Sequence, residues 1–231
     1  MKAQRISTGL PNLDKLIEGG FKKNSTNLVA GGAGSAKSIF AMQFMMDGLK
    51  KGEAGVYITF EEKKEKFYED MIEFGWDLDK YEKNGKFVFL EYTPEQVKQV
   101  LTEGGGVVES IIEKIKAKRL VIDSMTSFSL LYEDELTKKE AALALFELID
   151  KWDCTALLTS EDETPDGHII SAAFEFEVDG IILLYHVKLK GIRRRALEVL
   201  KMRGTKIPEK TLAIDITDKG IKLNPKKVEA F

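Results

Sequence analysis

Residues 31–38 have the composition and spacing of a phosphate-binding loop. Their sequence, Gly-Gly-Ala-Gly-Ser-Ala-Lys-Ser, follows an apolar β-prone segment and precedes an amphipathic helical segment. Small residues let successive backbone N–H groups point at phosphate oxygens, and the helix N-terminus adds further N–H groups and its dipole. Lys37 is expected to bind the β- and γ-phosphates of a nucleoside triphosphate, and the Ser38 hydroxyl to bind magnesium. The loop residues expected at the nucleotide are Gly32, Ala33, Gly34, Ser35, Ala36, Lys37 and Ser38.

The loop departs from the usual G-x-x-x-x-G-K-[ST] pattern because Ala36 stands where the second glycine is expected. If this position needs a positive φ, alanine costs on the order of 1 kcal/mol relative to glycine. Such a cost would slow or weaken nucleotide handling without abolishing it. Taken alone, the run also fits an ordinary glycine-rich turn between a strand and a helix.

Three carboxylates follow apolar strands and are candidates for metal and water chemistry. Asp123 ends the run Leu-Val-Ile-Asp, and Glu61 and Glu62 follow another apolar run. In a parallel α/β sheet, ligands bind beyond the carboxyl ends of the strands, where the phosphate loop also falls. Asp123 is therefore expected at the nucleotide and its magnesium, and Glu61 or Glu62 is expected to activate water as general base. The alternatives are a helix-capping aspartate and a solvated Glu-Lys run.

Two cations end a late strand in the sequence Lys-Met-Arg-Gly at 201–204. Arginine suits bidentate phosphate contacts and lysine acts as a point charge, so Lys201 and Arg203 can bind phosphate. Charge alone favours a different interpretation, an exposed strand end with solvated side chains. The three arginines at 193–195 are expected in a turn after Gly191, on a solvated face.

The remaining polar candidates rank lower. The run Thr-Ser-Glu at 159–161 ends an expected parallel strand and could sense the γ-phosphate. His168 follows Pro-Asp-Gly in an expected loop, and His186 lies near an expected strand end with no paired carboxylate in sequence, so surface or satisfied core positions are expected for both. Cys154 is the only cysteine; it is expected to be a buried small hydrophobe, and no Cys/His cluster with zinc-ligand spacing is present.

The order of elements predicts an α/β fold. Short continuous apolar strands separated by helices imply a mostly parallel sheet with helices on both faces. Four segments after Pro165 (180–185, 195–202, 212–215 and 220–223) have no convincing helix between them, so they are expected to add antiparallel strands at the C-terminal edge. The expected strands before them are 26–30, 54–60, 87–90, 119–123 and 155–159, and the expected helices are 39–46, 65–74, 107–115, 137–152 and one starting at Pro94. With no linker or repeat, residues 1–231 are expected to form a single domain.

Composition narrows the class of partner. The net charge of −3 gives no overall basic field to recruit nucleic acid or an anionic membrane, although a local basic patch remains possible. The N-terminus has no apolar core of a signal peptide, and no stretch is long enough to span a bilayer. A cytoplasmic protein without membrane contact is expected.

Taken together, the motifs resemble the KaiC-like branch of the RecA-type ATPases over nearly the whole chain. The resemblance rests on the lead-in to the phosphate loop and on four further motifs that match in order. These are Ile-Ser-Thr-Gly-Leu-Pro-Asn-Leu-Asp at 6–14 with Gly-Gly-Phe at 19–21, Thr-Phe-Glu-Glu at 59–62, Phe-Gly-Trp-Asp-Leu at 74–78, Val-Ile-Asp-Ser at 121–124 and Val-Leu-Lys-Met-Arg-Gly at 199–204.

The resemblance implies a RecA-like P-loop core that uses ATP and Mg²⁺. Glu61 corresponds to the catalytic glutamate with Glu62 beside it, and Asp123 corresponds to the Walker B aspartate. Lys201 and Arg203 match the pair of cations that reaches the γ-phosphate of a neighbouring subunit. A homo-oligomeric ring, most often a hexamer, is implied, with ATP between subunits.

Two departures limit what carries over from the circadian clock protein. That protein has two such domains in tandem, and this chain has room for one. Its phosphorylated Ser and Thr precede the Asp-Gly strand, where this chain has Phe-Glu-Phe-Glu-Val at 174–178 and no hydroxyl. Autokinase activity of the clock type is therefore not expected, and Ser171 nearby has no assigned role.

Three functions remain open on the sequence. The first is a slow, magnesium-dependent ATPase completed between subunits. The second is a DNA-binding recombination accessory protein of the RecA/RadB type, which the net charge disfavours. The third is a non-catalytic scaffold whose assembly is gated by ATP, which Ala36 in the loop makes plausible.

Overall fold

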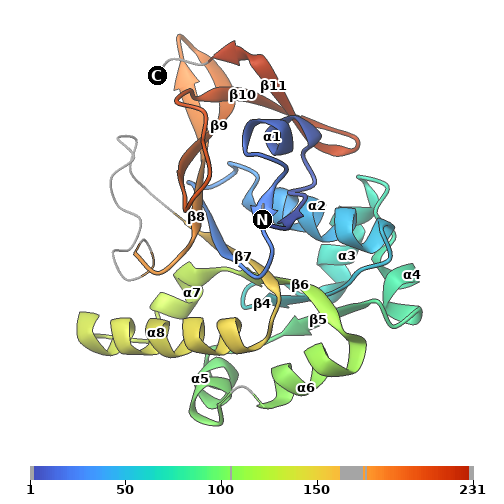
Figure 1. Cartoon of the computed structure of the whole chain (residues 1–231), viewed down its shortest axis with the longest axis vertical. Helices are drawn as coiled ribbons and strands as arrows, with labels where there is room; N and C mark the ends of the chain where they lie inside the picture. The colour runs from blue at the N-terminus through green and yellow to red at the C-terminus, as the bar shows by residue number, and fades with distance from the viewer. Residues whose placement is uncertain (1–2, 105, 162–173, 175, 229–231) are drawn as a thin grey trace.

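The computed structural model describes residues 3–104, 106–161, 174 and 176–228. Within these ranges the main sheet has nine strands in the order β11-β10-β9-β8-β3-β7-β6-β4-β5, with helices on both faces (Figure 1). The strands are β3 (Thr26–Ala30), β4 (Ala54–Thr59), β5 (Phe87–Glu91), β6 (Ala117–Asp123), β7 (Thr155–Ser160), β8 (Gly180–Leu189), β9 (Ile192–Met202), β10 (Leu212–Thr217) and β11 (Gly220–Val228). A short pair outside this sheet joins β1 (Arg5–Ile6) to β2 (Phe21–Lys22).

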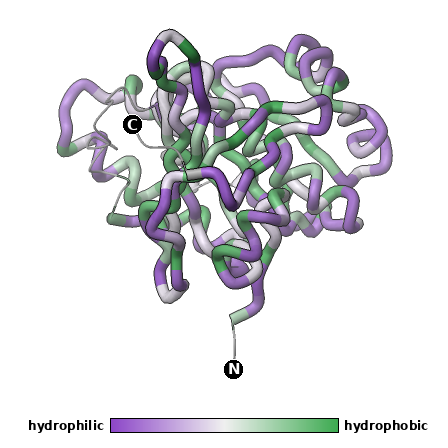
Figure 2. Tube along the Cα trace, turned by 90° about the horizontal axis from the view of Figure 1, so that it is seen from above, coloured by the Kyte–Doolittle hydropathy of each residue, from purple (hydrophilic) through white to green (hydrophobic). Residues whose placement is uncertain are grey.

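The helices form two layers around the sheet. One layer holds α1 (Pro11–Leu16), α2 (Lys37–Lys50), α3 (Lys64–Ile72) and α4 (Leu78–Lys83). The other holds α5 (Pro94–Thr102), α6 (Gly106–Ile115), α7 (Met125–Ser129) and α8 (Glu135–Lys151). Each layer packs its own hydrophobic core against one face of the sheet. Figure 2 shows the hydrophobic segments gathered toward the interior and hydrophilic ones along the outer loops.

The central strands are buried on both faces. Every residue of β3, β4 and β7 is buried, which is why their sequences read as continuous apolar runs instead of alternating ones. These strands run parallel, so their carboxyl ends meet at one edge of the sheet. The expected helices on both faces are confirmed. So is the buried placement of Cys154, whose thiol pKa burial raises to about 12.

The C-terminal edge differs from the expectation in one strand. β9, β10 and β11 are antiparallel, as predicted, but β8 pairs in parallel with β3, with Ala30 opposite Leu183. The prediction took the lack of a helical sequence before β8 as a sign of antiparallel pairing. A parallel strand needs a crossover of a dozen or more residues, and residues 161–179 supply that length. The three arginines at 193–195 lie within β9, so their expected placement in a turn is wrong.

The helix before β7 starts earlier than predicted. The expected start was residue 137, but α8 begins at Glu135 with Asp134 as its N-cap, whose carboxylate accepts a hydrogen bond from the Thr137 backbone N–H at 2.9 Å. Hydrogen bonds from Thr137 lower the pKa of Asp134, because they favour its charged form. The predictions for His168 and Ser171 fall outside the described residues.

Candidate functional site

The loop between β3 and α2 has the backbone geometry of an anion cradle. Its last residue, Ala36, is the N-cap of α2 and adopts a left-handed conformation with φ 84° and ψ 31°. Gly34 is also left-handed, with φ 72°. The positive φ that the glycine pattern requires is therefore present at Ala36, and this alanine carries the strain that the sequence predicted.

Polar atoms of the loop face inward. The Lys37 Nζ donates hydrogen bonds to the Gly31 and Gly32 carbonyl oxygens at 2.9 and 3.2 Å. The Ser35 hydroxyl is fully buried and has no hydrogen-bond partner among the described residues. A cation folded onto carbonyl oxygens and a buried, unpartnered donor both fit an anionic ligand, because phosphate oxygens would satisfy them.

Asp123 ends β6 with its carboxylate fixed from both sides. Its Oδ2 accepts a hydrogen bond from the Tyr57 hydroxyl at 2.7 Å, and its Oδ1 accepts one from the Thr159 hydroxyl. Tyr57 is fully buried, and burial together with the negative charge of Asp123 raises its pKa well above the ordinary value. The phenol therefore keeps its proton and acts as a donor. Asp123 is not the helix-capping residue of the alternative interpretation, since α7 has Ser124 as its N-cap.

Glu61 lies just beyond β4 and is held by the segment that follows β6. Its Oε1 accepts hydrogen bonds from the hydroxyls of Ser124 at 2.6 Å and Ser127 at 2.5 Å. Because Thr59 of β4 pairs in register with Asp123 of β6, the two strand ends carry both acids to the same edge. The structure thus brings Glu61 and Asp123 to neighbouring positions.

Glu62 is exposed but lies within the field of other acids. Partial burial and the nearby carboxylates of Asp123 and Asp70 raise its pKa. The backbone N–H groups of Glu61 and Glu62 both donate to the Thr59 hydroxyl at 3.3 Å, which holds the turn that carries them. A pocket of about 340 Å³ adjoins this turn.

Residues 159–161, the Thr-Ser-Glu sequence at the end of β7, lie at the same edge of the sheet as Asp123 and the phosphate loop. Thr159 donates to Asp123, as described above, and the Ser160 carbonyl accepts a hydrogen bond from Gly31 N–H at 3.1 Å. Glu161 N–H donates to the Thr126 hydroxyl at 2.7 Å. These contacts tie β7 to the phosphate loop and to α7.

Sequence reasoning missed two residues beside the loop. The Arg195 Nε on β9 donates to the Gly34 carbonyl oxygen at 2.9 Å. His186, its register partner on β8, lies so close to Gly34 that a Cβ there would be 3.1 Å from the His186 Nδ1. Partial burial and the neighbouring arginines lower the pKa of His186. No motif marks either residue; the only signal was the cluster of arginines, assigned to a solvated turn.

Lys201 and Arg203 lie elsewhere. Lys201 pairs with Ile181 near the start of β8, toward the sheet edge opposite the phosphate loop. Arg203 is beyond the end of β9, where its Nη2 donates to the Phe176 carbonyl oxygen at 2.6 Å and its Nη1 lies 3.6 Å from Asp179 Oδ1. The structure therefore does not bring these cations to the loop of the same molecule.

A family model described as the KaiC ATPase matches residues 6–228. The chain belongs to the KaiC family of ATPases.

Similar proteins align with most of the chain. A UPF0273 protein of Pyrococcus furiosus is 34% identical over 238 residues, which cover 97% of this chain and 96% of that protein. The circadian clock protein KaiC3 of Synechocystis sp. is 33% identical over 210 residues, which cover 87% of this chain and 42% of that protein. The crystal structure of a KaiC-like protein from Pyrococcus horikoshii superposes with a TM-score of 0.87 at 34% identity, covering 97% of this chain and 100% of that one.

The KaiC family and the topology confirm the expected fold class, a RecA-like P-loop core with an antiparallel C-terminal edge.

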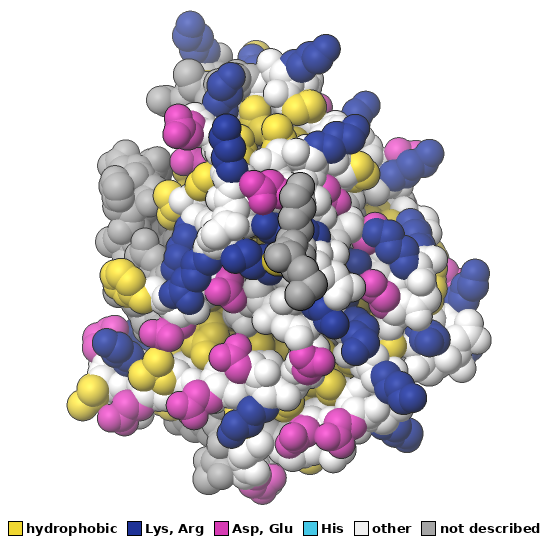
Figure 3. Space-filling model, in the orientation of Figure 1, with side chains coloured by type: hydrophobic (Ala, Val, Ile, Leu, Met, Phe, Trp, Pro, Cys, Tyr) yellow, Lys and Arg dark blue, Asp and Glu magenta, His cyan; other side chains and the backbone are white. Residues whose placement is uncertain are grey.

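Among the described residues, no helix is long and apolar enough to cross a membrane. On the face seen in Figure 3, basic and acidic side chains are interspersed over most of the surface.

The residues at the loop fit a magnesium ion that is bound together with a nucleotide. No group of three His, Cys, Asp or Glu side chains in the described part of the chain could hold a metal without help. Magnesium normally takes only one or two carboxylates and completes its shell with phosphate oxygens and water. The carboxylate of Asp123, which two hydroxyl donors hold in place, and the hydroxyl of Ser38 at the start of α2 would supply ligands of this kind.

Proposed function

We propose that this KaiC-family chain is a magnesium-dependent ATPase that converts ATP to ADP and phosphate. The observation that carries the proposal is the shared edge of the sheet. There the left-handed Ala36 closes a phosphate cradle, and β4 and β6 deliver Glu61 and Asp123 to adjacent strand ends. A binding loop, a metal-side carboxylate and an oriented acid are the parts that phosphoryl transfer to water requires.

Each residue has a stated task. The loop residues 32–38 hold the phosphates, with Lys37 exchanging its contacts to Gly31 and Gly32 for phosphate oxygens. Ser38 and Asp123 would hold magnesium, which when bound neutralises charge on the phosphates. Glu61, fixed by two serine hydroxyls, orients the attacking water and accepts its proton. Glu62 is the second candidate base, since its raised pKa suits proton acceptance nearer neutral pH.

We further propose that Lys201 and Arg203 act on the nucleotide of a neighbouring molecule in a ring. Their place near the opposite edge of the sheet supports this, because they cannot serve a loop from which the length of β9 separates them. Arginines supplied in trans stabilise the charge that develops in phosphoryl transfer. The match to the KaiC family favours this ATPase over a recombination accessory protein that binds DNA, and over a scaffold gated by ATP.

The first test is ATP turnover of the Glu61→Gln protein. Loss of the base should lower turnover by about 100-fold or more while ATP binding persists. Glu69→Gln, on the exposed side of α3, is the matched control and should turn over at the wild-type rate. Wild-type turnover by Glu61→Gln would remove Glu61 from the mechanism and move the role to Glu62.

The second test mixes two inactive proteins. Lys37→Ala removes the loop cation and Arg203→Ala removes the cation at the opposite edge. If the site is shared, a mixture contains pairs with one intact site, so turnover should return above that of either protein alone. A mixture that stays inactive, with wild-type turnover unchanged on dilution, would point to a site complete within one molecule.

A further inference from the structure

Tyr57 is placed by the sheet to reach Asp123. In the parallel pairing of β4 with β6, Tyr57 lies opposite Val121 and Thr59 lies opposite Asp123. Side chains two residues apart share a face, so Val121, Asp123 and Tyr57 all face the layer that contains α2. The phenol ring extends along the strands, and its hydroxyl meets Asp123 Oδ2 at 2.7 Å.

The ring of Tyr57 is fixed by aromatic packing. It stacks on Phe89 with ring centroids 5.4 Å apart and an interplanar angle of 15°, and it packs against Phe67 at 5.0 Å. Because the residue is fully buried, the hydroxyl cannot turn to water and its direction is set by the core. Tyr57 is therefore a rigid donor, with one acceptor.

Asp123 receives only neutral donors. Thr159 of β7 binds the second carboxylate oxygen, and no Lys or Arg in the described ranges forms an ion pair with Asp123. Each oxygen of a carboxylate has two lone pairs, so one hydroxyl on each leaves a second lone pair available. The carboxylate is oriented while its negative charge remains uncompensated, which is the state that a cation ligand needs.

We propose that Tyr57 is a positioning residue that fixes the Asp123 carboxylate for magnesium bound with the nucleotide. The inference rests on the proposed function and extends it to a residue outside every motif of the sequence. Partners that orient metal ligands in this way contribute about 10- to 100-fold to metal affinity. A phenylalanine at this position would fill the same space and leave Oδ2 free to rotate.

The chain offers a matched control in Tyr68. It lies on α3, packs against Phe89 at 5.6 Å and donates to a carboxylate oxygen of Glu82 at 3.3 Å. Burial and Glu82 also raise its pKa. Tyr68 thus shares the contact with Phe89 and the type of hydrogen bond with Tyr57, but it is only partly buried and its acceptor is Glu82, not Asp123. The two Tyr→Phe variants separate orientation of Asp123 from loss of a phenol.

The test measures binding of a fluorescent ATP analogue across a magnesium titration and in EDTA. For Tyr57→Phe, the half-saturating magnesium concentration should rise by about tenfold. Tyr68→Phe should stay within about twofold of wild type. In EDTA all three proteins should bind the analogue equally, because the loop itself is unchanged.

Each result has a separate meaning. An unchanged magnesium dependence for Tyr57→Phe overturns the inference and leaves the proposed ATPase intact. Equal weakening in EDTA also overturns it, because the hydroxyl would then support the fold and not the metal ligand. A wild-type protein that binds no analogue, or binds it without regard to magnesium, contradicts the proposed function itself.

A second variant covers loss of folding in Tyr57→Phe. Thr159→Val removes the donor to the other carboxylate oxygen, and Thr159→Ser keeps it. Thr159→Val should raise the half-saturating magnesium concentration by a similar factor, and Thr159→Ser should restore it. No change in Thr159→Val would contradict the idea that hydroxyls orient Asp123.

Discussion

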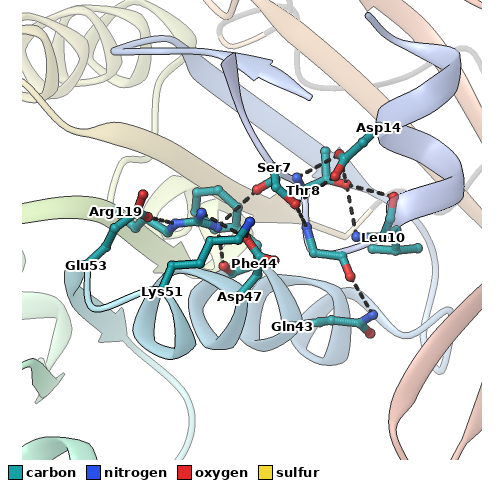
Figure 4. Close-up of polar contacts among 11 residues, drawn as sticks. Ser7, Thr8, Leu10, Asp14, Gln43, Phe44, Asp47, Lys51, Glu53 and Arg119 are labelled. Atoms are coloured by element: carbon teal, nitrogen blue, oxygen red, sulfur yellow. Dashed lines mark hydrogen bonds and ion pairs between the residues drawn. The ribbon is translucent and has the colours of Figure 1, made fainter. Parts of the chain in front are cut away.

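The two ends of β6 carry opposite charges, and in the part of the chain that the structure describes only the charge near the start of the strand is paired with an opposite charge. Near its start, Arg119 is 1% exposed and paired with two carboxylates. Its guanidinium pairs with Glu53 at 2.6 Å and Asp47 at 3.0 Å and donates to the backbone oxygens of Ser7 and Phe44 (Figure 4). At the other end, Asp123 meets two hydroxyls and, among the described residues, no cation.

The difference separates a charge that the fold itself neutralises from one that it leaves for the proposed magnesium site. The buried guanidinium of Arg119 contacts two carboxylates, two carbonyl oxygens and the face of the Phe44 ring, 4.6 Å away, so its charge is compensated within the fold. A carboxylate that only hydroxyls hold keeps its charge for a ligand. Four residues apart on one strand, the arginine thus stabilises the fold, and the aspartate has the orientation and the charge that the proposed magnesium site requires.

The largest expected effect is at the structural end. Arg119→Ala leaves Asp47 and Glu53 without their buried partner and should lower the free energy of unfolding by about 3–5 kcal/mol. Lys51→Ala is the control, because Lys51 pairs with the same Asp47 from an exposed position and should cost less than about 0.5 kcal/mol. Denaturant unfolding measures both. Equal small losses would show that Arg119 is not the structural charge described here.

At Asp123 we expect the reverse, a large loss of turnover and a small loss of stability. Asp123→Asn removes the charge but keeps the shape, so turnover should fall by about 100- to 1,000-fold. The amide nitrogen would face a hydroxyl donor, and unfolding should become easier by only about 1–3 kcal/mol. Steady-state hydrolysis and denaturant unfolding check the pair of effects. A variant that loses stability as Arg119→Ala does, with turnover intact, would abolish the contrast between the two ends.

The backbone allows a smaller comparison. Ala36 at the loop and Lys116 just before β6 both have positive φ, 84° and 54°. Glycine at either position removes the cost of a left-handed conformation, about 1–2 kcal/mol. Part of this gain is offset because glycine also makes the unfolded chain more flexible. Each variant should therefore gain about 0.5–1 kcal/mol in unfolding free energy. Only Ala36→Gly should alter nucleotide affinity, and an equal change in Lys116→Gly would disconnect loop strain from binding.

The smallest effect concerns Glu62 and pH. Because burial and Asp123 raise its pKa, the folded protein holds this proton more tightly than the unfolded chain does. Stability should fall as pH rises from the ordinary glutamate pKa through the raised folded value. Glu62→Gln should remove this loss and stabilise the neutral-pH protein by at most about 0.5 kcal/mol, since the side chain is exposed. Melting curves at neutral and acid pH test it, with no difference expected at the acid end.

The sequence predicted the parts of the fold that repeat a local pattern. Continuous apolar runs predicted the buried parallel strands, and the motif at residues 31–38 predicted the loop and the start of α2. The left-handed Ala36 also followed from the motif. The direction of β8 did not, because strand polarity depends on the connection and not on the strand's own residues.

The candidate site was predictable where a residue follows a strand or belongs to a motif. Arg195 and Tyr57 were not, because their roles depend on register: Arg195 reaches Gly34 from another strand, and Tyr57 reaches Asp123 across β4 and β6. The burial of Arg119 at the start of the predicted strand 119–123 did not follow from the sequence either, because its partners come from α2 and from the segment before β4. The catalytic roles, the shared site and the single-domain assignment for residues 1–231 stay predictions.

Gln43 on α2 joins two segments that are far apart in the sequence and are therefore synthesised at different times. Its side-chain amide donates to the Gly9 and Ile221 carbonyl oxygens, and its Oε1 accepts from Ile221 N–H at 2.7 Å. Ile221 is translated 178 residues after Gln43. The helix that carries Lys37 and Ser38 therefore gains its two bonds to Ile221 only after the chain has been made as far as β11, and hydrogen exchange of α2 should slow further once β11 has docked.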